Sequence, residues 1–269
     1  MAASSQGIFA GSLPEIYERV LVGPLFRPFA QEVLGRVAVA QNDRLLDVAC
    51  GTGIVARLAR EIVGSTGRVV GVDASPGMIA VAKAAAPGID WREGDAAHLP
   101  VGDDEAFDIV TCHQGLQFFP DKPAATREMH RVLVPRGRVA LATWRSVEEI
   151  PIMRDLQRIA ERHLGPVVDQ RHSFGDAEAL RRLLVEAGFH AIQTETVTCT
   201  IRMDDGAAFP RLSTMALVGM SAVAKAMSEE QRSQVSAAIA DESVGAAQSY
   251  LEGSQLVFDL ASNVAIARA

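Results

Sequence analysis

The chain has 269 residues and a formal net charge of −7, with 26 Lys and Arg against 33 Asp and Glu. This acidic balance, without a basic stripe interleaved with aromatic residues, argues against nucleic acid as a partner. No apolar run approaches the roughly 20 residues of a membrane span, and residues 1–13 lack the basic and apolar regions of a signal peptide. We therefore expect a cytoplasmic protein. The cysteines lie far apart and the histidines are scattered singly, which predicts neither disulfides nor a metal site.

The first predicted element is helical and covers residues 16–39. Proline removes an amide donor and crowds the preceding turn of a helix. We therefore expect breaks near Gly23-Pro24 and at Pro28.

The next elements meet at residues 45–53, which read Leu-Leu-Asp-Val-Ala-Cys-Gly-Thr-Gly. An apolar run ends in a carboxylate, a loop of small residues follows, and residues 54–62 are amphipathic. This order predicts a strand, a tight turn and a helix, the arrangement that presents a nucleotide-type cofactor to a helix N-terminus. Gly51 and Gly53 lack a Cβ atom, so the backbone can turn sharply and a ligand can approach it closely.

Two cofactors compete for this loop. Residues 51–56 fit the G-x-G-x-x-A dinucleotide pattern, and Asp73 lies about 20 residues on, where a ribose-binding acid is expected. Asp47, however, would repel a pyrophosphate and would favour a cationic cofactor that carries an ammonium and a sulfonium. Ala49 also stands where a dinucleotide site more often has its first glycine. Together these two residues favour S-adenosylmethionine over NAD.

Two further acids follow predicted strands. Residues 69–73 form a β-branched run that ends in Asp73, which can accept hydrogen bonds from both hydroxyls of a ribose. The helix that follows begins near Met78, whose thioether could pack on an adenine face. A third apolar segment leads to Asp95, which could accept from the adenine amine. Each acid alone is better explained as a helix N-cap, but three acids after three strands together favour a binding site.

These motifs resemble a known family. Residues 47–53, 71–78 and 93–100 look like the class I S-adenosylmethionine-dependent methyltransferases, and in particular the subfamily of the ubiquinone and menaquinone biosynthesis C-methyltransferases. Residues 107–110 and 128–137 are similar to the same family's fourth strand and following helix. The resemblance implies an α/β fold, a Rossmann-like three-layer α/β/α sandwich. It implies a seven-stranded, mostly parallel sheet whose last strand is antiparallel, and we expect a helical cap insertion in addition.

The resemblance also implies a set of cofactor contacts. In the family, the positions that contact the cofactor match Asp47, Ala49, Gly51, Asp73, Met78, Asp95 and Ala96. We extend the expected cofactor site to Gly53, Ala74, His113 and Gln114. Asp73 would hold the ribose, Asp95 the adenine, and Asp47 with the loop the methionine end. An N-terminal segment closes over the cofactor in the family, where Tyr17, Phe26 and Arg27 would line the entrance; alternatively, they staple the segment to the sheet.

The remaining elements complete the expected core. Residues 138–144 and 194–203 read as strands, 176–187 as a capped helix and 256–267 as the last strand. The predicted division is an N-terminal helical segment at 1–42, a core at 43–203 and 254–269, and an insertion of two or three helices at 204–253. Half of the eight methionines lie between Met203 and Met227. They suit an apolar acceptor, a dimer interface or an ordinary core equally well.

Methyl transfer itself asks little of the protein, because a sulfonium methyl is already activated. The acceptor must be held at attack distance and shielded from water, and oxygen or carbon acceptors usually need a base. His113, directly after the predicted fourth strand, is the candidate base; alternatively, it and Gln114 hydrogen-bond the cofactor or cap the next helix. His172 would reach the acceptor from above or would be an exposed loop histidine. The candidate acceptor-binding residues are Tyr17, Phe26, Phe118, Phe119, His172 and Met215.

The sequence therefore predicts a methyltransferase that transfers a methyl group from S-adenosylmethionine to a small, apolar molecule by in-line displacement. The product would be S-adenosylhomocysteine, with no metal and no nucleic acid involved, and a homodimer stays open. One alternative is an NAD-linked oxidoreductase, which Asp47 and Ala49 disfavour and which lacks a Tyr-x-x-x-Lys pair. The other is a non-catalytic regulatory module that binds S-adenosylmethionine.

Overall fold

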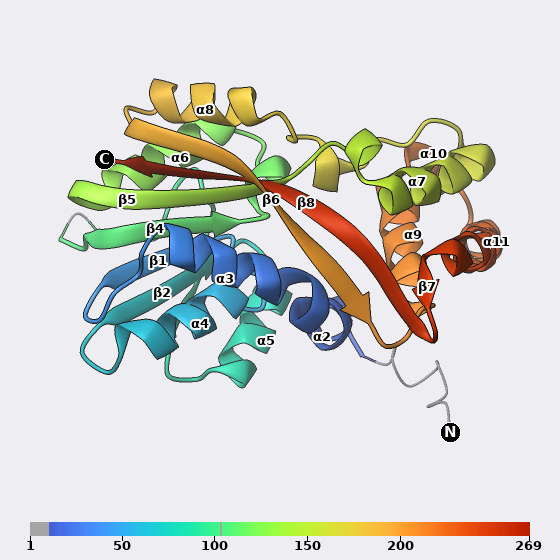
Figure 1. The fold of residues 1–269 in the computed structure, drawn as a ribbon, viewed down its shortest axis with the longest axis horizontal. Helices are drawn as coiled ribbons and strands as arrows, with labels where there is room; N and C mark the ends of the chain where they lie inside the picture. The colour runs from blue at the N-terminus through green and yellow to red at the C-terminus, as the bar shows by residue number, and fades with distance from the viewer. Residues whose placement is uncertain (1–10, 103) are drawn as a thin grey trace.

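The computed structural model describes residues 11–102 and 104–269. A single twisted sheet is covered by helices on both faces, and a group of helices stands at one end of it (Figure 1). The strands are β1 (Arg44–Val48), β2 (Arg68–Asp73), β3 (Asp90–Glu93), β4 (Phe107–His113), β5 (Leu133–Trp144), β6 (His190–Met203), β7 (Leu251–Glu252) and β8 (Gln255–Arg268). The α-helices are α2 (Leu13–Tyr17), α3 (Arg27–Arg36), α4 (Ile54–Val63), α5 (Pro76–Ala85), α6 (Lys122–Arg131), α7 (Pro151–Leu164), α8 (Ala177–Glu186), α9 (Ala208–Met220), α10 (Ala222–Ala226) and α11 (Glu229–Ala247). The other helical turns are η1 (Glu18–Phe26), η2 (Leu116–Phe118), η3 (Val147–Glu149), η4 (Gln170–His172) and η5 (Gln248–Tyr250).

The sheet runs in the order β3-β2-β1-β4-β5-β8-β6. The first five strands of this order are parallel, and β8 is antiparallel to both β5 and β6. The three-layer α/β prediction with an antiparallel last strand is thus confirmed. The predicted count of seven strands is wrong, because the sheet has eight. Strand β7 pairs only with the start of β8, across a turn in which Gly253 has a φ of 64° that suits glycine.

Neighbouring residues of the central strands face opposite sides of the sheet. Leu45 and Ile109 pack into the cluster under α3, α4 and α5, whereas Leu46 and Val110 pack into the cluster under α6 and α8. Parallel strands covered on both faces are apolar throughout, which is why these strands appear in the sequence as continuous apolar runs. The carboxyl ends of β1, β2 and β4 therefore come together at one edge of the sheet.

The N-terminal segment is helical from residue 13 to residue 36 without a non-helical gap, so the expected break near Gly23-Pro24 is wrong, whereas a new helix, α3, does begin beside Pro28. Gly23 and Pro24 lie inside η1, a π-helix of nine residues. The wider π turn leaves room for a proline ring that would clash in an α-helix. Pro28 stands in the first turn of α3, where a missing amide proton has no cost. Residues 1–10 of the predicted N-terminal segment lie outside the described residues.

Three α-helices, α9 to α11, occupy the predicted insertion at 204–253. Their packing against α7 was not predicted from the sequence. Ile159 and Leu164 of α7 share an apolar cluster with Leu217 of α9 and Ile239 of α11. Helix α11 begins with a capping box at Ser228, in which the Gln231 side chain also takes part. Figure 1 shows this group beside the ends of β6 and β8. None of the helices within the described residues is long and apolar enough to cross a membrane.

Candidate active site

The loop between β1 and α4 is shaped by three residues with positive φ. Ala49 has a φ of 56°, Gly51 of 56° and Gly53 of 91°. A Cβ atom at Gly53 would lie 2.2 Å from Cη2 of Trp91, whereas a Cβ at Gly51 would have no atom within 4 Å. Gly53 is therefore required by packing beneath the loop. Gly51 faces open space, where a ligand can approach the backbone.

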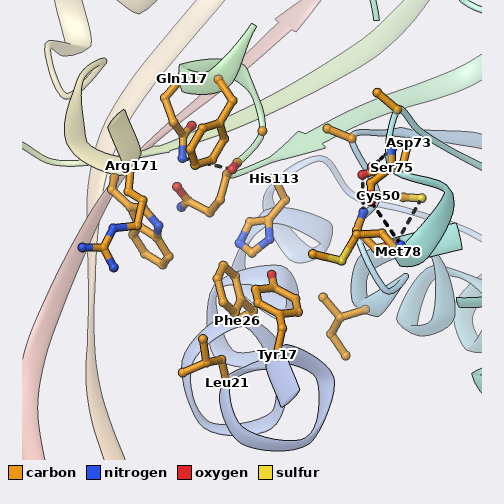
Figure 2. Close-up of a pocket in the computed structure, with 18 of the residues that line it drawn as sticks. Tyr17, Leu21, Phe26, Cys50, Asp73, Ser75, Met78, His113, Gln117 and Arg171 are labelled. Atoms are coloured by element: carbon orange, nitrogen blue, oxygen red, sulfur yellow. Dashed lines mark hydrogen bonds between the residues drawn. The ribbon is translucent and has the colours of Figure 1, made fainter. Parts of the chain in front are cut away.

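The carboxylate of Asp73 ties this loop to the start of α5. One oxygen accepts from the backbone amide of Gly51 at 2.8 Å, and the other accepts from the amide of Ser75 at 2.8 Å (Figure 2). Ser75 caps α5 through its hydroxyl, which accepts from the amide of Met78 at 3.3 Å. Each oxygen of Asp73 retains a second lone pair, so the side chain can also accept from ligand hydroxyls.

A cavity of about 670 Å³ opens at this edge of the sheet. Most of the predicted site residues line it, and these are Tyr17, Phe26, Ala49, Gly51, Asp73, Ala74, Met78, Asp95, Ala96, His113, Gln114, Phe118, Phe119 and His172. Four predicted residues are not part of the wall: Arg27, Asp47, Gly53 and Met215. Met215 is 44% exposed, while Ser213 and Ala216 of the same helix face the cavity.

Asp47 lies behind the loop and is only 1% exposed. One carboxyl oxygen accepts from the hydroxyl of Thr111 at 2.8 Å, and the other has no hydrogen-bond partner. Burial raises the pKa of Asp47 to about 7, and the hydrogen bond from Thr111 opposes the effect. The expected role of Asp47 at the methionine end stays a prediction.

His113 is the last residue of β4 and is 8% exposed. Its Nε2 atom has no hydrogen-bond partner, and its ring stands perpendicular to that of Phe26 at 6.1 Å between centroids. Burial lowers the pKa of His113 to about 3. The imidazole is therefore neutral near pH 7 and is a poor proton acceptor, which favours a positioning role over that of a general base.

The helix η1 covers the cavity from the N-terminal side. Tyr17 and Phe26 pack with their ring centroids 4.9 Å apart, and both face the cavity. An ion pair of 2.7 Å between Glu18 and Arg57 joins η1 to α4, directly after the glycine loop. Burial raises the pKa of Tyr17, so its hydroxyl stays protonated.

The opposite end of the cavity is formed by residues that the sequence analysis missed. Figure 2 shows Asp73, Ser75 and Met78 on one side of the view and Arg171 on the other, with His113 between them. Trp144, Met153, Phe209, Leu212 and Leu260 supply apolar wall, and Gln117 and Ser213 supply polar groups. Gln117 is a polar residue inside an apolar run beside Phe118, and this departure from the pattern was the available signal.

The charge of Arg171 is already compensated. Its guanidinium donates to both oxygens of Asp169, at 2.8 and 2.7 Å, and to the hydroxyl of Ser213 at 3.2 Å. His172 is buried, with Nδ1 2.7 Å from the carbonyl oxygen of Arg145. The alternative of an exposed loop histidine is therefore wrong, because the loop folds under the cap and encloses the ring.

Comparisons with known proteins agree with this site. The sequence matches the model of the methyltransferase domain over residues 46–141. A 2-phytyl-1,4-naphtoquinone methyltransferase of Synechococcus elongatus is 39% identical over 128 residues, which cover 45% of this chain and 54% of that protein. A demethylmenaquinone methyltransferase of Staphylococcus epidermidis is 32% identical over 186 residues, which cover 62% of this chain and 76% of that protein. The match thus spans about half the length of the first relative and three quarters of the second.

The fold agrees as well. The solved structure of the YcgJ protein of Bacillus subtilis superposes with a TM-score of 0.58 at 20% identity, over 90% of this chain and 98% of that one. The predicted resemblance to quinone methyltransferases is confirmed by the sequence relatives. The matched residues include the glycine loop, Asp73 and His113. With a matched domain at the cavity and a relative covered over three quarters of its length, this chain belongs to the methyltransferase family.

Proposed function

We propose that the protein transfers a methyl group from S-adenosylmethionine to a small, largely apolar molecule. The observation that carries the proposal is one cavity with two unlike ends. One end has the glycine loop and Asp73, and the other has mainly apolar side chains. The two quinone methyltransferases named above are relatives, so a flat apolar acceptor is our first candidate.

The residues at the first end fit the cofactor. Gly51 leaves the space that a Cβ atom would fill, and Asp73 has lone pairs that suit the two ribose hydroxyls. Met78 and Ala96 offer apolar surface to an adenine, and Asp95, which is exposed on the same wall, is our candidate acceptor for the adenine amine. When bound, the cofactor supplies an activated methyl group on a sulfonium.

The protein's own contribution is to position the acceptor and exclude water. Trp144, Phe26 and Phe209 give the acceptor end apolar walls, which suit a molecule that leaves water readily. The neutral His113 stands between the two ends and can orient the acceptor by a hydrogen bond. Holding the reacting atoms in line is the main requirement of such a displacement. The cytoplasmic location and a homodimer stay predictions from the sequence.

Calorimetric titration with S-adenosylmethionine, S-adenosylhomocysteine and NAD tests the cofactor. We expect micromolar binding of the first two and no binding of NAD, which would also remove the oxidoreductase alternative. Asp73→Asn should weaken binding at least tenfold, because an amide replaces one accepting oxygen by a nitrogen that cannot accept from a ribose hydroxyl. Asp176→Asn is the matched control, since Asp176 also accepts from the amide two residues on but caps α8 outside the cavity wall. Equal affinity for Asp73→Asn and the wild type would contradict the proposal.

A further inference from the structure

The side chain of His172 lies in the wall between the cavity and a second hollow at the surface. The residue is 7% exposed and lines both. The preceding residue, Arg171, marks the end of the cavity that lies opposite Asp73 (Figure 2). The hollow is lined by polar residues that follow β5 and begin α8, among them Arg145 and Asp176. A nearly buried imidazole therefore separates the acceptor end from this hollow.

The tautomer of His172 is fixed by the main chain. Its Nδ1 lies 2.7 Å from the carbonyl oxygen of Arg145. A carbonyl oxygen only accepts, so Nδ1 carries the proton, and Nε2 of the neutral ring has the lone pair. Arg145 lines the hollow and not the cavity. Because the two nitrogens of an imidazole point away from each other, Nε2 points to the cavity side.

The Nε2 atom of His172 is free and open to a ligand. It has no hydrogen-bond partner among the described residues, and it is not one of the unpartnered atoms that the protein encloses fully. The rest of the ring is buried, so this nitrogen is the part of the side chain that can act on a molecule in the cavity.

The loop that bears His172 is held on both sides. Asp169 caps η4 through its side chain, and Asn263 of β8 donates to the carbonyl of Gly175 at 2.7 Å. A Cβ atom at Gly175 would lie 2.3 Å from the amide nitrogen of Ser146, so the loop packs directly on the chain that follows β5. These contacts hold the imidazole in one orientation, as a group that acts on a bound molecule requires.

The charges around His172 suit a proton acceptor. Burial lowers its pKa, the Asp169 carboxylate and the Arg145 carbonyl oppose this effect, and the Arg171 guanidinium adds to it. The ring is therefore neutral at pH 7, and both oxygens stabilise the imidazolium once it forms. His113 has no such partner, and burial lowers its pKa to about 3. His172 is therefore the stronger base of the two.

We propose that His172 is the general base of methyl transfer and takes up, on Nε2, the proton that the methyl acceptor loses. This inference rests on the proposed function. In the step, the nucleophilic atom of the acceptor forms a bond to the methyl carbon, and the carbon–sulfur bond breaks with its electron pair staying on sulfur. The bond between the nucleophilic atom and its proton also breaks; its electron pair stays on that atom, and the proton goes to Nε2. The imidazolium releases this proton to water after the product has left.

Labelling with diethyl pyrocarbonate tests where Nε2 points. The reagent carbethoxylates an unprotonated histidine nitrogen, and mass spectrometry of peptides from the full chain, labelled at pH 7, gives the rate at His172. Ala216→Trp fills the acceptor end from α9 and should slow the reaction at least about tenfold, because it closes the path to Nε2. Ala177→Trp fills the hollow instead and should leave the rate nearly unchanged. The exposed His190 should react equally in all three proteins.

Turnover with S-adenosylmethionine tests the role of the base. At pH 7, 2-naphthol keeps its proton, whereas 2-naphthalenethiol, of the same shape, is largely ionised and needs no base. His172→Asn keeps a donor for the Arg145 carbonyl but has no basic nitrogen. It should methylate the naphthol about a hundredfold more slowly than the wild type, and it should retain most of the rate with the thiol. His163→Asn, on α7 outside the cavity wall, should retain both rates.

Calorimetric binding of S-adenosylmethionine separates the two levels of the argument. If the wild type does not bind it, the proposed function falls and the base falls with it. With binding intact, the inference alone is overturned by a wild type in which His172 is not labelled, or by labelling that Ala177→Trp blocks in place of Ala216→Trp. It is equally overturned by similar losses of both rates in His172→Asn, or by a wild type that methylates neither probe. If Ala216→Trp does not fold, Leu212→Trp of the same wall replaces it.

Discussion

The buried carboxyl group of Asp47 should make the stability of the protein fall as the pH rises from 5 to 8. Burial raises its pKa from the ordinary 3.8 to about 7, so the folded state favours the protonated form. For an acid with a raised pKa, the stabilising contribution is complete below about pH 4 and is lost as the pH rises through about 7. The difference between the two pKa values corresponds to a change of roughly 4 kcal/mol in the free energy of unfolding, at about 1.4 kcal/mol per pKa unit.

Asp47→Asn removes this dependence without removing the acceptor for Thr111. The new amide has its own desolvation cost, since Oδ2 of Asp47 has no partner, but that cost does not vary with pH. The informative quantity is therefore the difference in unfolding free energy between variant and wild type. From the two pKa values, this difference should move by about 2 to 3 kcal/mol in favour of the variant between pH 5 and pH 8.

Urea unfolding followed by tryptophan fluorescence at pH 5, 6, 7 and 8 measures this difference. Asp108→Asn is the control, because the Arg44 guanidinium lowers the pKa of Asp108 and the carboxyl is ionised in both states above pH 5. Its effect on stability should stay constant over the same range. A difference for Asp47→Asn that is equally flat would refute the argument that burial governs this carboxyl group.

Two further predictions concern the loop and the imidazole. Gly53→Ala should lower the free energy of unfolding by about 3 kcal/mol or more, since its methyl would meet Trp91 in addition to the strain of a positive φ. Gly51→Ala should cost only about 1 to 2 kcal/mol in urea unfolding but should weaken cofactor binding in the calorimeter, and the reverse order of stabilities would contradict this division of roles. His113 should stay neutral from pH 8 to pH 5 because burial lowers its pKa to about 3, so its Cε1–H resonance, assigned with His113→Asn, should not move. A shift with a midpoint near 6.5 would restore the general-base interpretation.

The cofactor half of the cavity was predictable because it depends on local patterns. The glycine loop and Asp73 follow short apolar strands, and parallel strands bring their carboxyl ends together wherever this order occurs. The same logic placed His113 at the sheet edge. The local pattern did not predict that Asp47 is buried, because its burial depends on distant parts of the chain such as Thr111, 64 residues further on, whose hydroxyl it accepts from.

The acceptor half was harder to predict because its signals are not periodic. The short turn that contains Gln117 looks ordinary in the sequence. Only the structure shows that its amide nitrogen is hydrogen-bonded and that its amide oxygen is not. Arg171 and Ser213 are 42 residues apart and meet only because α9 folds back over η4. The π-helix η1 was not predicted for another reason. Proline normally breaks a helix, and the wider turn that admits Pro24 has no sequence signature.

The division between the two halves bears on how the acceptor would be selected in this protein. The matched domain, residues 46–141, supplies the cofactor end and the polar set of His113, Gln114 and Gln117. Most of the apolar wall at the acceptor end comes from η1, α7, α9 and β8, outside that domain. Under the proposed function, the matched domain holds the methyl donor, while the surrounding helices set the shape of the acceptor. Function is placed on a fold by sites of this kind, so under the proposed function we expect a change of acceptor shape to require substitutions in η1, α7, α9 or β8 and not in the glycine loop.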